Sequence, residues 1–138
     1  MQKIGILGNG FVGNSVAFGF SPTHEIRICD KDPKKNLNSL EEVVECDFIF
    51  VAVPTPMNQD GSINLDIVER ALDEISEKNK IDNIIIIKST MIPGTMSKLI
   101  EKYPNLNLVF NPEFLTERTA KLDFLTQARM VLGGDPKH

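Results

Sequence analysis

Residues 3–13 read KIGILGNGFVG. The mostly apolar residues 3–7 predict a short strand, and the glycines at 8, 10 and 13 then follow the pattern G-x-G-x-x-G. In parallel α/β sheets with this pattern, the first glycine permits a sharp turn and the second lets a phosphate approach the backbone. The third glycine allows close packing of the helix on the strand. The stretch therefore predicts a strand–turn–helix unit that offers helix N-terminal amides to a phosphate.

Apolar runs alternate with helical patterns along the rest of the chain. The expected strands are Lys3–Leu7, Glu25–Cys29, Asp47–Val53, Asn83–Lys88, Leu106–Phe110 and Arg129–Leu132. The expected helices are Phe11–Phe20, Ser39–Glu45, Leu65–Lys78, Gly94–Lys102 and Thr116–Leu125. Ser39 and Glu42 form a capping-box pattern, and the third helix carries one apolar stripe at Leu65, Val68, Leu72 and Ile75. Because most of the strands are apolar on both faces, they suit a parallel sheet between two helix layers. We expect a doubly wound, Rossmann-type α/β domain over residues 1–138, with strand order 3-2-1-4-5-6.

Composition excludes several classes of protein. The chain has 138 residues, which is the size of one ordinary domain, and its net charge is −4. This charge argues against nucleic acid or an anionic membrane as the main partner. No apolar run, Ile84–Ile87 included, approaches the length needed to span a membrane. Cys29 and Cys46 form no CxxC pair, so we expect buried thiols in the cytoplasm, and no cluster has the spacing of a metal site.

Asp30 directly follows the second expected strand, 17 residues after Gly13. A carboxylate there can accept hydrogen bonds from both hydroxyls of the adenosine ribose and would repel a 2′-phosphate. This favours NAD over NADP as the cofactor. Three nearby lysines leave the alternative open, because they could bind a 2′-phosphate instead of lying in a solvated turn; they are Lys31, Lys34 and Lys35.

Four further segments carry a family resemblance. They read VAVPTP at 51–56, KSTMIPGT at 88–95, NPEFL at 111–115 with Glu117, and RMVLGG at 129–134. Together with the glycine loop, in this order, they resemble the N-terminal NAD-binding domain of the UDP-glucose/GDP-mannose dehydrogenase family. The resemblance implies oxidation of a sugar C6 alcohol to a carboxylate with two NAD, through a cysteine thioester that water then hydrolyses.

The chain departs from the family pattern in two places. Residues 31–46 form only one turn and one short helix. The corresponding segment is usually longer in the family. The family's catalytic cysteine and its substrate-binding lysine and asparagine belong to a second domain that these 138 residues do not include. Cys29 and Cys46 match neither the position nor the motif of that cysteine. We therefore expect these residues alone to bind NAD without oxidising a nucleotide sugar, and a homo-oligomer is possible.

The resemblance also assigns site residues. It implies that Glu113 is the base that activates the hydrolytic water, that Glu117 lies near the sugar or the water, and that Thr90 joins the same network. The implied cofactor-binding residues are Gly8, Gly10, Phe11, Val12, Gly13, Asp30, Val53, Pro54, Thr55 and Thr90. The alternatives are structural. Glu113 can be a solvated loop acid, Glu117 can complement a helix dipole, and Thr90 can bond neighbouring backbone.

Two other functions fit the glycine loop. β-Hydroxyacid and 6-phosphogluconate dehydrogenases share it and use no cysteine, although the PEFL and STMIPGT segments argue against them. A non-catalytic module that binds a nucleotide for assembly or regulation is the second alternative.

Overall fold

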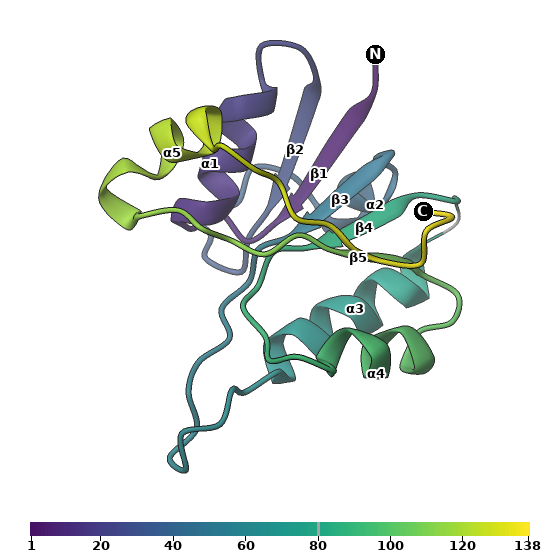
Figure 1. Ribbon diagram of the computed structural model, residues 1–138. Helices are drawn as coiled ribbons and strands as arrows, with labels where there is room; N and C mark the ends of the chain where they lie inside the picture. The colour runs from purple at the N-terminus through teal and green to yellow at the C-terminus, as the bar shows by residue number, and fades with distance from the viewer. Residues whose placement is uncertain (80) are drawn as a thin grey trace.

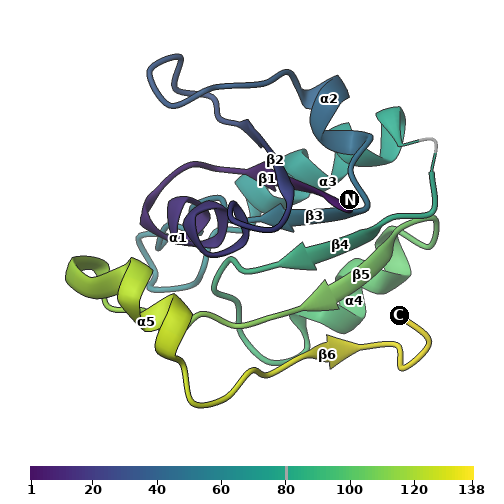
Figure 2. The same ribbon diagram turned by 90° about the horizontal axis from the view of Figure 1, so that it is seen from above.

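The computed structural model describes residues 1–79 and 81–138 of the chain. These residues form a six-stranded sheet with helices on both faces (Figures 1 and 2). The strands are β1 (Lys3–Leu7), β2 (Glu25–Cys29), β3 (Phe48–Val51), β4 (Ile84–Ile87), β5 (Asn107–Phe110) and β6 (Gly133–Gly134). The helices are α1 (Phe11–Phe20), α2 (Leu40–Val44), α3 (Asp66–Lys78), α4 (Thr95–Lys102), the 3-10 turn η1 (Glu117–Thr119) and α5 (Ala120–Thr126). The Rossmann-type α/β class is confirmed.

The sheet has the strand order β2-β1-β3-β4-β5-β6, so the expected order 3-2-1-4-5-6 is wrong. The third strand lies between β1 and β4 instead of outside β2. The chain between β2 and β3 carries the short helix α2, which crosses one face of the sheet and brings β3 to the free edge of β1. Strand order therefore reverses at β1, and a ligand crevice is expected outside the carboxyl ends of β1 and β3.

The last strand also differs from the prediction. Strand β6 is Gly133–Gly134, not Arg129–Leu132, and it runs antiparallel to β5. The apolar residues Met130 and Leu132 are 59% and 62% exposed, so their hydrophobicity does not reflect burial in a strand. Gly134 has a φ of 151°, and a Cβ there would lie 2.9 Å from the Leu108 carbonyl oxygen, so glycine allows the close pairing with β5.

Alternate residues of the central strands supply two separate cores. Ile4 and Ile6 pack with Val16 of α1, on the face that α5 also covers. On the opposite face, Ile85 and Ile87 belong to a larger core with residues of α2, α3 and α4. The predicted apolar stripe of α3 is confirmed at Val68, Leu72 and Ile75, which are fully buried, whereas Leu65 is the partly buried N-cap of the helix. Among the described residues, no helix is long and apolar enough to cross a membrane.

The segment between β2 and β3 begins with a turn that covers the outer edge of β2. Asn38 donates its backbone N–H to the Ile28 carbonyl oxygen at 2.7 Å, and its Oδ1 accepts the Ile28 N–H at 2.9 Å. The backbone N–H of Asp30 donates to Oδ1 of Asn36 at 2.8 Å. Asparagine side chains thus supply partners that a neighbouring strand would otherwise provide.

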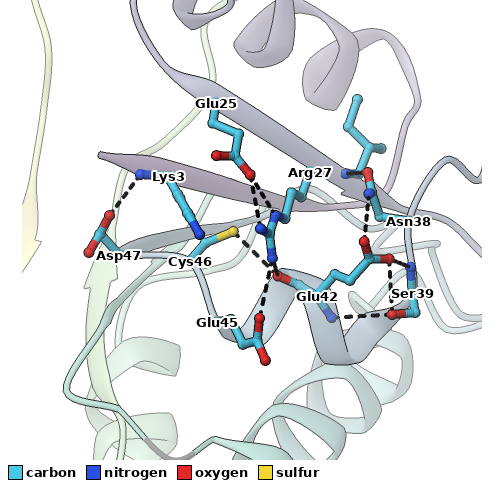
Figure 3. Close-up of polar contacts among 10 residues, drawn as sticks. Lys3, Glu25, Arg27, Asn38, Ser39, Glu42, Glu45, Cys46 and Asp47 are labelled. Carbon is cyan, nitrogen blue, oxygen red and sulfur yellow. Dashed lines mark hydrogen bonds and ion pairs between the residues drawn. The ribbon is translucent and has the colours of Figure 1, made fainter. Parts of the chain in front are cut away.

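Helix α2 is fixed at both ends (Figure 3). At its start, Ser39 Oγ accepts the Glu42 N–H at 3.2 Å and Glu42 Oε2 accepts the Ser39 N–H at 2.8 Å, which confirms the capping box that the sequence pattern predicts. Farther along, the Arg27 guanidinium of β2 donates to the Glu42 carbonyl oxygen at 3.0 Å. Five residues suffice for a helix here because side chains bond both termini.

We predict that Ser39→Ala lowers the free energy of unfolding by about 1 kcal/mol, since it removes the acceptor for a helix N-terminal amide. Urea unfolding followed by circular dichroism measures this change. Ser21→Ala is the control, because Ser21 is exposed and its hydroxyl bonds only to the Phe18 carbonyl oxygen in the last turn of α1. An equal loss in both variants would contradict the capping role.

Candidate functional site

The glycine loop is held by close backbone contacts. Gly8 has a φ of 93°, and its N–H donates to the Cys29 carbonyl oxygen at 2.9 Å. A Cβ on Gly8 would lie 2.5 Å from the Ala52 carbonyl oxygen, and one on Gly13 would collide with the carbonyl oxygen of Gly8. The first and third glycines are therefore required by packing, whatever binds in the loop.

Gly10 differs from the other two glycines. It is the N-cap of α1, with φ −77° and ψ −166°, and no side chain caps the helix. A Cβ on Gly10 would have no atom within 4 Å, so it would project into open space. The space in front of the first amides of α1 is therefore open because residue 10 has no side chain. An anionic group that binds at a helix N-terminus needs such a space.

Asp30 is tied to this loop. Its Oδ2 accepts the Asn9 N–H at 2.6 Å, and its Oδ1 accepts the Asp32 N–H at 2.8 Å. The Asn9 side chain also reaches across the loop, where Nδ2 donates to the Lys35 carbonyl oxygen at 2.8 Å. The carboxylate at the end of β2 is therefore oriented before any ligand arrives, with lone pairs left for further donors.

Two hollows flank the loop at the carboxyl edge of the sheet. The first has a volume of about 430 Å³ and includes Gly8, Gly10 and Asp30 in its lining. The second is also about 430 Å³ and includes Thr55, Thr90 and Glu113. The four residues shared by both linings are Gly10, Ala52, Val53 and Pro54. The two hollows are thus parts of one crevice that runs across the glycine loop.

The structure brings most of the predicted site residues to this crevice. Phe11 and Val12 line the second hollow, whereas Gly13 packs beneath the loop and does not line it. Glu117 is exposed in η1 and lines a separate hollow with Phe11 and Asn14. Of the three lysines that could bind a 2′-phosphate, Lys31 and Lys35 line the first hollow beside Asp30.

Glu113 is not a solvated loop acid. Its side chain is 11% exposed, and its Oε1 accepts the N–H groups of Phe114 at 2.9 Å and Leu115 at 3.0 Å. Its Oε2 lies 3.2 Å from Nζ of Lys88 and accepts no hydrogen bond from the residues that the structure describes. One oxygen is therefore fixed by backbone and the other stands next to a buried cation.

Lys88 was not singled out by the sequence analysis. It is 4% exposed, and its Nζ donates to Oδ1 of Asn111 at 2.8 Å. Burial lowers the pKa of Lys88, and the negative charge of Glu113 opposes that shift. The signal was present in the sequence, because a lysine directly after Ile84–Ile87 continues a strand that is otherwise apolar. Lys88 was predicted only as the last residue of a strand, and its burial at the site was not foreseen.

Ser89 was missed as well, and it fixes the loop after β3. Its hydroxyl donates to the Val53 carbonyl oxygen at 2.7 Å, and its side chain is buried. Thr90, the next residue, is exposed in the second hollow. Ser89 thus supports the VAVPTP segment, and Thr90 faces the crevice.

The two cysteines lie away from Glu113. Cys46 is fully buried behind α2, and burial raises the pKa of its thiol to about 11. Cys29 is partly buried in the lining of the first hollow, where burial also raises its pKa. Neither thiol lines the second hollow, and both are disfavoured as thiolates at neutral pH.

Comparison with known proteins assigns the family. Residues 34–138 match the NAD-binding domain of the UDP-glucose/GDP-mannose dehydrogenase family. The chain belongs to this family. A putative UDP-glucose 6-dehydrogenase of Bacillus subtilis is 32% identical, in an alignment that covers 96% of this chain and 39% of that protein. The chain thus spans about two-fifths of the length of such a dehydrogenase.

Solved structures agree with the family and with the fold. A UDP-glucose dehydrogenase from Pyrobaculum islandicum superposes with a TM-score of 0.83 at 26% identity, over 99% of this chain and 41% of that one. A GDP-mannose dehydrogenase from Pseudomonas aeruginosa superposes with a TM-score of 0.87 at 23% identity, over 99% and 42%. The second comparison supports the fold alone.

The residues present fit the NAD of this family. A pyrophosphate requires free helix amides without a Cβ in front of them, and Gly10 provides that space. A ribose requires an oriented acceptor, and Asp30 is held next to the loop by the Asn9 N–H. The crevice on either side of the loop leaves room for the two halves of a dinucleotide.

We predict that alanine at two glycines of the loop has different effects, on NAD binding at one and on stability at the other. Gly10→Ala changes the free energy of unfolding by less than about 1 kcal/mol, since its backbone angles suit alanine. It abolishes NAD binding, because the methyl group occupies the phosphate space. Gly13→Ala destabilises the fold by more than about 1 kcal/mol, because it overlaps the Gly8 carbonyl group.

Thermal unfolding and calorimetric titration with NAD separate the two effects. Wild-type affinity in folded Gly10→Ala would contradict the placement of the phosphates at this helix end.

Proposed function

We propose that this chain forms the cofactor half of a nucleotide-sugar 6-dehydrogenase, which oxidises the C6 alcohol of UDP-glucose or a similar sugar nucleotide to the carboxylate. The observation that carries the proposal is the single crevice that joins Asp30, the glycine loop and the buried Glu113. It combines an acceptor for ribose hydroxyls, free helix amides and a held carboxylate. A module that only binds a nucleotide would not need the held carboxylate of Glu113.

The residues of the crevice have distinct roles in this proposal. NAD accepts hydride when bound here. The amides at the start of α1 bind the pyrophosphate, and Asp30 accepts hydrogen bonds from the adenosine ribose. Val53, Pro54 and Thr55 form the wall that orients the cofactor over the ends of β1 and β3. Together they fix the position of the reacting carbon, which is the main contribution that a binding domain makes to rate.

Glu113 serves as the base for the hydrolytic step. Because Oε1 is occupied by two backbone N–H groups, Oε2 is the oxygen left to take a proton. Oε2 is buried beside Lys88, so the hydrolytic water has to enter the hollow to reach it. Thr90 presents a hydroxyl to the same hollow and can hold that water. Glu117 lies on the far side of Phe11, in a hollow open to solvent, and this position suits contact with the sugar nucleotide better than with the water.

The nucleophile must come from elsewhere. Cys29 lines the end of the crevice that holds Asp30, and Cys46 is buried behind α2. Neither is placed to form the thioester beside Glu113. The cofactor half and the thiol therefore have to come together from different parts of the active protein.

Asp30 provides the test of the cofactor assignment. We predict that Asp30→Asn weakens NAD binding about tenfold or more, because it removes a charged acceptor for the ribose hydroxyls. We also predict that the wild-type chain binds NAD more tightly than NADP. Isothermal titration calorimetry measures both effects.

Asp47→Asn is the matched control, since Asp47 Oδ2 accepts the Lys3 N–H at 2.7 Å in the same manner, but outside the crevice. Tighter binding of NADP than of NAD would show that Lys31 and Lys35 form a phosphate site instead.

We predict that the 138 residues alone form no NADH from UDP-glucose or GDP-mannose, since neither thiol lies beside Glu113. NADH absorbance in the presence of the purified chain, NAD and the sugar nucleotide checks this expectation. Sustained turnover would mean that a residue within these 138 supplies the nucleophile, or that the reaction needs none.

A further inference from the structure

The ion pair of Lys88 and Glu113 lies at a defined end of the crevice. Asp30 lines the first hollow and the pair lines the second, with Gly10 common to both. If the pyrophosphate sits on the α1 amides and the adenosine ribose on Asp30, the second hollow is left for the nicotinamide half. This placement rests on the proposed function.

The nicotinamide ring changes charge in the reaction, since it is a cation in NAD and neutral in NADH. A buried ion close to it therefore affects the two forms differently. An unpaired Glu113 would bind the oxidised form more tightly and so oppose hydride transfer. An unpaired Lys88 would weaken binding of the oxidised form. When the lysine and the carboxylate are paired, their opposite effects on the two forms of the cofactor largely cancel.

The surroundings of Lys88 suit this cancelling role. Its Nζ lies 2.8 Å from Oδ1 of Asn111 and 3.2 Å from Oε2 of Glu113. The Asn111 amide is itself fixed, since its Nδ2 donates to the Val131 carbonyl oxygen at 2.8 Å. Three segments, from β4, β5 and the chain before β6, therefore hold the cation against one carboxylate oxygen.

Stability alone does not account for a lysine here. A buried ion pair contributes little compared with apolar side chains of similar volume, because both charges lose their hydration. The burial of Lys88 lowers its pKa, which reflects the same cost. The neighbouring Ile85 and Ile87 of β4 show that apolar residues fill this strand elsewhere.

We propose that Lys88 is a positioning residue that holds the Glu113 side chain in place and cancels its charge at the nicotinamide end of the crevice. The Glu113 carboxylate can then lie close to the nicotinamide without favouring the oxidised cofactor. Lys88 acts through Glu113 and by its charge, and it takes no proton from the substrate.

The test is the ratio of NAD and NADH affinities of the 138-residue chain, measured by calorimetric titration. Lys88→Met leaves Glu113 unpaired and shifts the ratio toward NAD, on the order of three- to tenfold. Glu113→Gln leaves Lys88 unpaired and shifts it toward NADH by a similar factor. The double variant returns the ratio to the wild-type value. A purely structural role would not move the ratio in opposite directions.

Two further variants guard against loss of folding and non-specific effects. Lys88→Arg keeps the positive charge and restores most of the wild-type ratio. Lys102→Met is the matched control, because Lys102 pairs with Glu69 at 2.7 Å on the helices outside the crevice, and it leaves the ratio unchanged. If Lys88→Met does not fold, Glu113→Gln still carries the test, since its expected shift has the opposite sign.

The outcomes separate this inference from the proposed function. Binding of NAD by the wild type, with an unchanged ratio in folded Glu113→Gln, overturns the role of Lys88 and leaves the cofactor assignment standing. Absence of binding of both NAD and NADH by the wild type overturns both. Opposite shifts in the single variants and their cancellation in the double variant support the inference.

Discussion

The close approach of the glycine loop to its neighbours is the constraint on which the site depends. Gly8 lies against the Ala52 carbonyl group, and Gly13 lies against Gly8 itself. These contacts bring the start of α1 down onto the ends of β1 and β3, where strand order reverses. Without them, the helix amides would stand away from the crevice, and the Asp30 carboxylate would lose the Asn9 N–H that orients it.

The sequence pattern predicted local structure well because local signals decide it. The bounds of β1 and β2, the capping box of α2 and the apolar stripe of α3 all follow from residues within a few positions of one another. Strand order was predicted wrongly because it depends on which edge of β1 the chain reaches after α2. The pattern of residues 31–46 contains no signal for that choice.

The contacts of Lys88 at the site were missed for a similar reason. Most of the predicted site residues lie in the crevice, since the glycine pattern and the segment 51–56 are contiguous motifs. Lys88 and Asn111 lie 23 residues apart and meet only because β4 and β5 are neighbours in register. Their contact with Glu113 could not be seen from the spacing, and a lysine at a strand end is usually solvated.

The asparagines beside β2 have a consequence for the behaviour of the protein in solution. Strand β2 is the outermost strand on its side of the sheet, and an uncovered outer strand can recruit a strand from another molecule. Asn38 bonds the backbone groups of Ile28 within β2, and Asn36 bonds the Asp30 N–H just beyond the strand, so an incoming strand cannot pair at these positions. The condensed segment therefore covers part of this sheet edge as well as connecting two strands.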